Sequence, residues 1–152
     1  TLMRSSAASD VYKRQEYKEQ VKELEKHSIA HFYGFQSDPR PFYIEADCIV
    51  LPSYHEGMSN VILEAAATGR PVITSNIPGC RESVENGKSG LLVEVKNKEM
   101  LYDAMKEMLH CSREEREQMG QAGREKMERE FRKEVVVEKT VQSLREDEKR
   151  DF

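Results

Sequence analysis

Short apolar runs alternate with helical patterns along most of the chain. Four of these runs are bounded by Gly, Pro or Ser and are apolar on both faces, as in strands that helices cover on each side. The runs are His31–Phe35, Cys48–Leu51, Pro71–Thr74 and Gly90–Val93. Because strands that alternate with helices form parallel sheets, the pattern predicts an α/β layer fold with right-handed crossovers.

Helical patterns lie between and after these runs. Glu16–Lys26 is polar and helix-prone, Asn60–Thr68 is short and apolar, and Cys80–Glu85 is brief. Asn97 is a predicted N-cap for a longer helix with one apolar stripe. That stripe consists of Met100, Leu101, Ala104, Met105, Met108 and Leu109.

The last part of the chain is rich in charges of both signs at helical spacing. Ser112–Arg129 and Lys133–Lys149 predict two further helices with narrow apolar stripes. We expect both helices to lie across the surface of the body, with their charged faces in water. The stripes are Met119, Gly123, Met127 and Phe131, and then Val137, Val141 and Leu144.

These patterns divide the chain into three parts. Residues 1–15 join no hydrophobic pattern, and we predict that they are a non-native or disordered leader. Residues 16–110 form the predicted α/β domain, and residues 111–152 form the predicted amphipathic helices. The core and the chemistry are therefore expected within residues 16–110.

Composition narrows the classes of function. Of the 152 residues, 38% are hydrophobic and 34% are charged, and the net charge of −4 argues against a nucleic-acid-binding protein. No run approaches the ~20 apolar residues that span a bilayer. Cys48, Cys80 and Cys111 form no Cys-x-x-Cys pair, which fits a reducing, cytoplasmic setting. We expect no zinc site, because only His27 and His31 of the four histidines lie four positions apart and no Cys-x-x-Cys pair accompanies them.

The loop after the second apolar run carries the candidate chemistry. A strand ends at Pro52, a polar loop follows, and a helix begins at Ser59 or Asn60. In open parallel sheets such loops line ligand sites, where free backbone N–H groups and the positive end of a helix bind phosphate. The candidate N–H donors belong to Gly57, Met58, Ser59 and Asn60.

Two carboxylates flank this helix start. Glu64 lies in a segment that is apolar nearly all round, so we expect it to be buried, and no cation lies three or four residues away. We predict that it accepts hydrogen bonds from ligand hydroxyls, the alternative being a tertiary ion pair. Glu56 precedes the helix, and on its own it indicates no more than a negative charge that interacts with the positive end of the helix dipole. Together the two carboxylates and the phosphate-ready helix match a nucleotide-sugar, which has a ribose, a diphosphate and a hexose.

Further motifs follow in order between residues 27 and 110. Besides the spacing of Glu56 and Glu64 they are Ala46-Asp47, Leu51-Pro52-Ser53, Gly69-Arg70-Pro71-Val72-Ile73, Pro78-Gly79-Cys80-Arg81-Glu82 and Asn86-Gly87-Lys88-Ser89-Gly90-Leu91-Leu92-Val93. In these motifs the chain resembles the C-terminal, donor-binding domain of retaining glycosyltransferases with the GT-B architecture. It is most similar to the bacterial capsule and polysaccharide branch of glycosyltransferase family 4.

The resemblance implies a Rossmann-like parallel sheet with flanking helices, the C-terminal half of a GT-B fold, followed by charged C-terminal helices. It implies that residues 16–110 bind a nucleotide-diphosphate sugar, that Glu56 is the catalytic residue facing the donor sugar, and that Glu64 binds the ribose. It also implies transfer with retained configuration and without a cofactor or essential metal. The amides implied to contact the donor are those of Gly57, Met58, Ser59 and Asn60.

The chain also departs from the family pattern. Family members have an N-terminal domain with the acceptor site, and a Gly-Arg…Lys-Gly segment whose basic side chains hold the diphosphate. Nothing before Tyr17 matches either feature. We therefore expect this chain alone to transfer no sugar and to be marginally stable. In the parent enzyme the acceptor would be a saccharide or polyprenyl-linked molecule, and the enzyme would be cytoplasmic, associating peripherally with the inner face of the membrane.

Two other classes of function stay open at this point. One is a non-catalytic nucleotide-binding module that uses the same cleft, and the other is an interaction domain whose C-terminal helices dock a second chain. Among the remaining residues, Cys48 and Cys80 are expected to be packing residues and His55 an exposed loop residue. Arg81 and Glu82 open a short helix at the same rim, and we expect no ligand contact from them.

Overall fold

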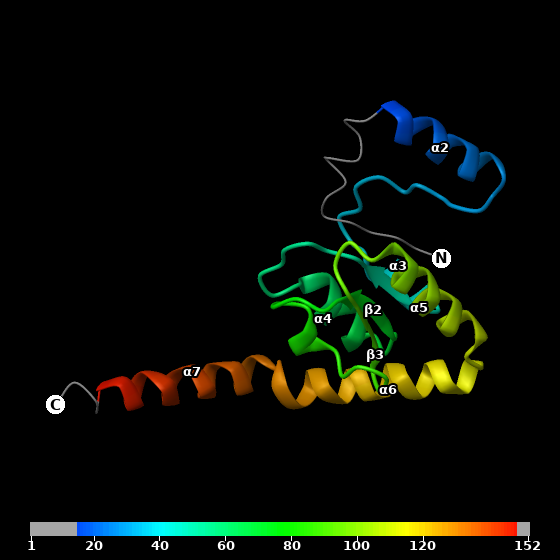
Figure 1. The fold of residues 1–152 in the computed structure, drawn as a ribbon. Coiled ribbons are helices and arrows are strands. Elements are labelled where there is room, and N and C mark those ends of the chain that lie inside the picture. The colour runs from blue at the N-terminus through cyan, green and yellow to red at the C-terminus, as the bar shows by residue number, and fades with distance from the viewer. Residues whose placement is uncertain (1–14, 149–152) are drawn as a thin grey trace.

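The computed structural model describes residues 15–148, which form a three-stranded sheet with helices around it (Figure 1). The strands are parallel and lie in the order β1-β2-β3, with Ile49 opposite Val72 and Val72 opposite Gly90. Their bounds are β1 Ile49–Leu51, β2 Val72–Ser75 and β3 Gly90–Val93. Three of the four predicted strands and the predicted parallel sheet are therefore confirmed.

The helices agree with the sequence pattern to within a few residues at each end. Their bounds are α2 Gln15–Lys26, α3 Arg40–Glu45, α4 Asn60–Ala67, α5 Lys98–His110, α6 Arg113–Glu130 and α7 Lys133–Glu148, with a short 3-10 helix, η1, at Arg81–Ser83. The sequence pattern did not predict α3. Its signals are Pro41 in the first turn and Asp38, whose carboxylate accepts the N–H of Arg40 at 3.0 Å.

The strands contribute side chains to two hydrophobic cores, one on each face of the sheet. The first core joins β1 and β2 to α3, α4 and the η1 segment, and contains Tyr43, Ala46, Ile49, Leu51, Ile62, Ala65, Val72, Cys80 and Val84. The second joins the strands to α5, and contains Val50, Ile73, Leu91, Val93, Ala104 and Met108. Because successive strand residues point to opposite faces, runs that are apolar at nearly every position supply both cores.

The α5 helix begins where the sequence predicts. The side chain of Asn97 accepts the N–H of Met100 at 2.9 Å, so it is the N-cap. Ala104 and Met108 of the predicted stripe are buried, whereas Leu109 is 77% exposed. The stripe is narrower than predicted: Leu109 and Met100, which is 38% exposed, lie about 100° and 80° around the helix from Met108, at the two margins of the stripe.

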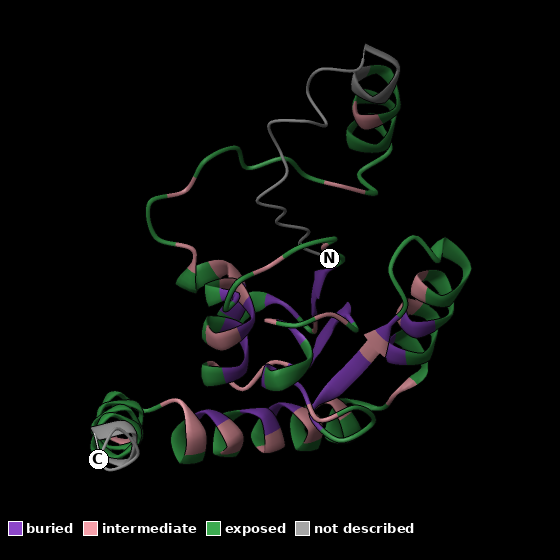
Figure 2. Ribbon diagram, turned by 60° about the vertical axis from the view of Figure 1, so that its left-hand side comes forward, coloured by how far each residue is buried: buried purple, intermediate pink, exposed green. Residues whose placement is uncertain are grey.

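The α6 helix lies along the edge of the sheet at which the strands begin (Figure 1). A Cβ atom on Gly120 would lie 1.9 Å from the carbonyl oxygen of Gly69, just before β2. Arg116 Nη2 lies 3.5 Å from Asp47 Oδ1, just before β1. Figure 2 shows that the buried positions of α6 face the body, as the sequence predicts. This helix therefore covers the amino ends of the strands and leaves the loops at their carboxyl ends uncovered.

The α7 helix does not lie across the body, so that prediction is wrong. Its apolar stripe is exposed, with Val137, Val141 and Leu144 at 53%, 39% and 61%. The helix begins at Lys133, beyond the part of α6 that packs on the sheet, and extends away from it (Figure 1). A narrow stripe indicates that a helix has one apolar side, but it does not identify what covers that side.

The strand predicted at His31–Phe35 is not formed. Phe32, Tyr33 and Phe35 are 48%, 50% and 88% exposed, and the segment pairs with none of the three described strands. A strand needs a neighbour for its N–H and C=O groups, and apolar composition alone does not supply one. The predicted leader, residues 1–15, lies outside the described residues except for Gln15, the first residue of α2.

Candidate functional site

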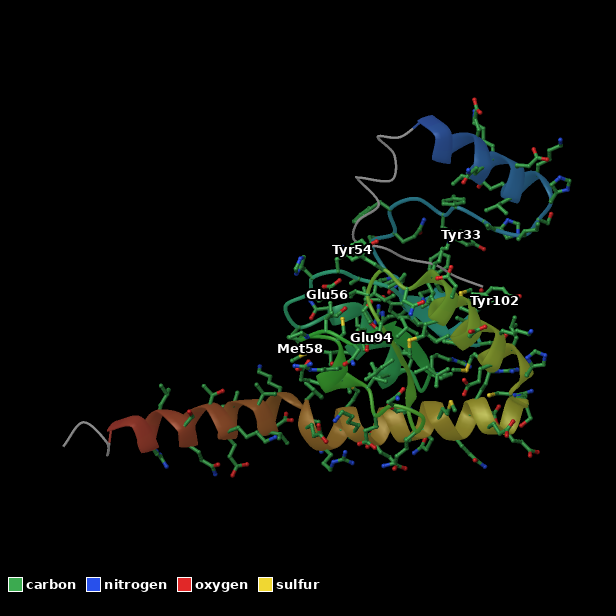
Figure 3. All side chains as sticks on the ribbon, in the orientation of Figure 1. Tyr33, Tyr54, Glu56, Met58, Glu94 and Tyr102 are labelled. Carbon is green, nitrogen blue, oxygen red and sulfur yellow. The ribbon has the colours of Figure 1, made fainter. Side chains whose placement is uncertain are left out.

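Three loops meet at the carboxyl edge of the sheet, one after each strand. The loop after β1 reaches that after β3, because the Lys96 ammonium lies 6.0 Å from the ring centre of Tyr54. The loop after β2 reaches it too, since Asn76 Nδ2 donates to Glu94 Oε1 at 3.2 Å. Figure 3 shows Tyr54, Glu56 and Met58 following one another along the first loop. In open parallel sheets this edge is where ligands bind.

Glu56 is held in the loop between β1 and α4. The hydroxyl of Ser53 donates to Glu56 Oε1 at 2.8 Å, and the Glu56 side chain is half-buried. The bond fixes one carboxylate oxygen and leaves the other available to a ligand. Ser53 was not among the predicted site residues, although the Ser-x-x-Glu spacing was visible in the sequence.

The start of α4 offers backbone N–H groups, but not all of those predicted. Ser59 is the N-cap, and its N–H already donates to the Gly79 carbonyl oxygen at 3.3 Å, so its predicted role as a free donor is wrong. The N–H groups of Met58, Asn60 and Val61, like that of Gly57, have no acceptor within residues 15–148. With the positive end of the helix dipole, these groups suit an anionic ligand.

The loop between β1 and α4 is packed against the loop after β2. Gly79 has φ of +85°, and a Cβ on it would lie 1.5 Å from the carbonyl oxygen of Gly57. The N–H of Gly79 donates to Glu82 Oε2 at 2.7 Å. The sequence motif that contains Gly79 and Glu82 was recognised, but this contact between two loops cannot be inferred from the sequence.

Glu64 is on the exposed side of α4, so the prediction that it is buried is wrong. The buried side of this short helix consists of Ile62, Ala65 and Ala66, and the alanine at position 67 is exposed like Glu64. An apolar residue count does not imply burial when several of the residues are small alanines. Glu64 forms no ion pair within the described residues, so the alternative of a tertiary ion pair is not supported either.

One cation lies near Glu64. The hydrogen bond to Asp38 raises the pKa of Arg40, and the negative charge of Glu64 raises it further. The same hydrogen bond lowers the pKa of Asp38 to about 2. Arg40 is therefore paired with Asp38, whose Oδ2 lies 2.8 Å from Arg40 Nη2. The Glu64 carboxylate remains exposed to solvent.

The predictions that Cys48 and Cys80 are packing residues and that His55 is exposed are confirmed. Cys80 is buried in the first core, Cys48 packs against the second, and His55 is exposed. Among residues 15–148 no helix is long and apolar enough to cross a membrane. In the same residues no three His, Cys, Asp or Glu side chains are grouped as metal ligands.

The family model for glycosyl transferases group 1 matches residues 10–126 of the chain. The chain belongs to this family. This group 1 glycosyltransferase chain is 33% identical, over 102 residues, to the capsular polysaccharide biosynthesis glycosyltransferase CapM of Staphylococcus aureus, covering 67% of this chain and 27% of CapM. It is 31% identical, over 113 residues, to the lipopolysaccharide core biosynthesis glycosyltransferase LpsE of Rhizobium meliloti, covering 74% of this chain and 33% of LpsE.

Among solved structures, the group 1 chain is similar to HepE from Anabaena in complex with UDP. The TM-score is 0.80 at 20% identity, and the match covers 96% of this chain and 41% of HepE. The likeness confirms the predicted fold class, the Rossmann-like half of a GT-B fold. The chain spans only 27% and 33% of the two curated relatives above, so it corresponds to a part of each.

Proposed function

We propose that this chain is the donor-binding part of a retaining hexosyltransferase of glycosyltransferase family 4, which binds a nucleotide-diphosphate sugar. One observation carries the proposal. Along the chain, the free N–H groups at the start of α4 lie between two carboxylates, Glu56 in the loop before the helix and Glu64 one turn into it. Glu64 lies four positions after Asn60 in the helix, a rise of roughly 6 Å along its axis.

In this proposal each group binds a different part of the donor. The N–H groups of Gly57, Met58 and Asn60 bind the diphosphate, with the buried Ser59 supporting them. As the bond to the sugar breaks, these dipoles stabilise the charge that develops on the leaving diphosphate. Glu64, exposed beside them, accepts hydrogen bonds from the ribose hydroxyls. Glu56 contacts the donor sugar with the oxygen that Ser53 does not bind.

The relatives support this assignment at a coarser level. CapM and LpsE are named for capsular and lipopolysaccharide core biosynthesis. HepE, which has the same fold, was crystallised with UDP and with UDP-glucose. We propose by analogy that the parent of this chain acts in polysaccharide biosynthesis, with neither a cofactor nor an essential metal.

The remaining parts of the proposal concern the longer protein. The acceptor, a saccharide or polyprenyl-linked molecule, would bind to a second, N-terminal domain, and the parent enzyme would work in the cytoplasm at the inner face of the membrane. The 152-residue chain alone is expected to bind donor without transferring sugar, because domain closure over both substrates completes such a site.

The test compares two substitutions in the longer protein by titration calorimetry with UDP and UDP-glucose. Hydrogen bonds to a charged acceptor are worth about 1.5–3 kcal/mol, so Glu64→Gln should lower the affinity for both ligands roughly tenfold or more. Glu56→Gln should leave the affinity for UDP nearly unchanged and reduce the rate of sugar transfer by the longer protein. Glu107→Gln, on the exposed side of α5, is the matched control and should change neither. Equal weakening of UDP by both site variants would overturn the division of roles.

A further inference from the structure

Two loops that follow different strands interlock through Gly79. Its Cα lies against the carbonyl oxygen of Gly57, and its own carbonyl oxygen accepts the N–H of Ser59 at 3.3 Å. Both partners belong to the loop that leads into α4. The position of Gly79 therefore sets the position of the backbone on which the free N–H groups of Met58 and Asn60 are carried.

Gly79 in turn is held by one side chain. Its N–H donates to Glu82 Oε2 at 2.7 Å, a shorter hydrogen bond than the one of 3.3 Å that the Gly79 carbonyl oxygen accepts from the Ser59 N–H. The other oxygen of Glu82 lies 3.4 Å from Arg81 Nε, in an ion pair whose two side chains are about half exposed. A charged acceptor forms a stronger hydrogen bond than a neutral one, so the bond from the Gly79 N–H to Glu82 is stronger than the bond from the Ser59 N–H to the Gly79 carbonyl oxygen.

We propose that Glu82 is a positioning residue for the diphosphate site. Its carboxylate binds the N–H of Gly79, and Gly79 in turn contacts the carbonyl oxygen of Gly57 and accepts the N–H of Ser59. Through these contacts Glu82 preorganises the N–H groups at the start of α4 for the ligand. The proposal rests on the proposed function for the identity of the ligand, but not for the coupling between the loops. Glu82 touches no reacting atom in this scheme, because its effect passes through the backbone of Gly79.

This role differs from that of a residue that merely closes a turn. Glu82 lies in η1, and a carboxylate that accepts an N–H three residues earlier also stabilises the short 3-10 helix locally. A purely local role would affect Gly79 and η1 and leave the Ser59 amide unchanged. Coupling across the two loops would affect Ser59 as well, and with it the affinity for a diphosphate.

The test uses heteronuclear NMR on the full 152-residue chain, with amide hydrogen exchange and a titration with inorganic pyrophosphate. Pyrophosphate carries the group common to all nucleoside-diphosphate sugars, so the nucleotide base does not matter. Glu82→Ala should speed amide exchange at Gly79 and Ser59 by roughly tenfold and lower the affinity for pyrophosphate by a similar factor. Glu82→Gln keeps an acceptor oxygen but loses the charge, so it should restore only part of both. The control Glu107→Ala should change neither.

Each other outcome has a definite meaning. Faster exchange at Gly79 but not at Ser59 would overturn the proposal, because the effect would then be confined to the turn. If exchange at Ile73 in β2 also rises, the chain is opening globally, and Glu82→Asp, which keeps the charge on a shorter side chain, replaces Glu82→Ala in the comparison. Absence of pyrophosphate shifts at Met58 and Asn60 in the unmodified chain would contradict the proposed function and leave the exchange comparison intact.

Discussion

The Cα of Gly79 lies so close to the carbonyl oxygen of Gly57 that no side chain fits between them. A Cβ on Gly79 would be 1.5 Å from that oxygen, and the φ of Gly79 is +85°, where L residues are strained. Glycine is thus required there for two independent reasons. The first is steric and concerns the loop before α4, and the second is a property of the Gly79 backbone itself.

The two reasons can be separated with a matched pair of alanine substitutions. Gly87 has a similar φ, +75°, but a Cβ on it would meet nothing within 4 Å. Gly87→Ala should therefore cost only the backbone strain, about 1 kcal/mol of unfolding free energy. Gly79→Ala should cost about 2–4 kcal/mol, because the loop that carries Gly57 must also move. Urea unfolding measures both, and equal losses would show that the loops part freely.

A second matched pair tests how α6 is seated on the body. A Cβ on Gly120 would lie 1.9 Å from the carbonyl oxygen of Gly69, whereas a Cβ on Gly123 would lie 3.6 Å from the Cβ of Ala66, an ordinary contact. In a helix interior alanine is about 0.5–1 kcal/mol more favourable than glycine.

Gly123→Ala should therefore raise the free energy of unfolding by about 0.5–1 kcal/mol. Gly120→Ala should lower it by about 1–3 kcal/mol, because the helix must move away from the turn before β2. Urea unfolding of the two variants gives the sign directly. A stabilising Gly120→Ala would mean that α6 does not approach Gly69 as closely as described.

Elements whose residues are buried on all sides could be predicted from the sequence. The runs that became β1, β2 and β3 are apolar at nearly every position, because each strand contributes to a core on both faces. The cap at Asn97 could also be predicted, since it is a local hydrogen bond to Met100, three positions later.

Features that depend on distant residues could not be predicted. His31–Phe35 is as apolar as the other runs but has no strand beside it among the described residues, and α7 has a stripe but no surface under it. In the site, the sequence indicated Glu56 and the helix start. The bond between Ser59 and Gly79 joins residues twenty positions apart, so it left no local signal.

Cys48 should be nearly inert to alkylation in the folded chain. Burial raises the pKa of its thiol from 9.0 to about 12. At pH 8 the thiolate fraction should then be roughly one in ten thousand, compared with about one in ten for an exposed thiol, and the thiolate is the reactive form. Iodoacetamide labelling followed by mass spectrometry should show modification at least about a hundredfold slower in buffer than in urea. Comparable rates would contradict the burial of Cys48.

The order of the loop around Gly79 should depend on pH only in the acid range. The hydrogen bond from its own backbone N–H, followed by that from Gly79, holds the pKa of Glu82 below its ordinary 4.5. A lowered pKa means that the charged form is favoured in the folded state. Its contribution is therefore complete above pH 4.5 and is lost as the pH falls through the lower folded value.

The chemical shifts of Gly79 and Ser59, and their amide exchange rates relative to those of an unstructured chain at the same pH, should thus stay constant from neutral pH down to about pH 5 and change below it. Glu82→Gln cannot titrate at this position, so its Gly79 amide should show no such acid transition. Other carboxylates of the chain titrate in the same range, and comparison with this variant isolates the part due to Glu82. A transition of the same size in Glu82→Gln, or one centred above pH 5, would show that another group controls the loop.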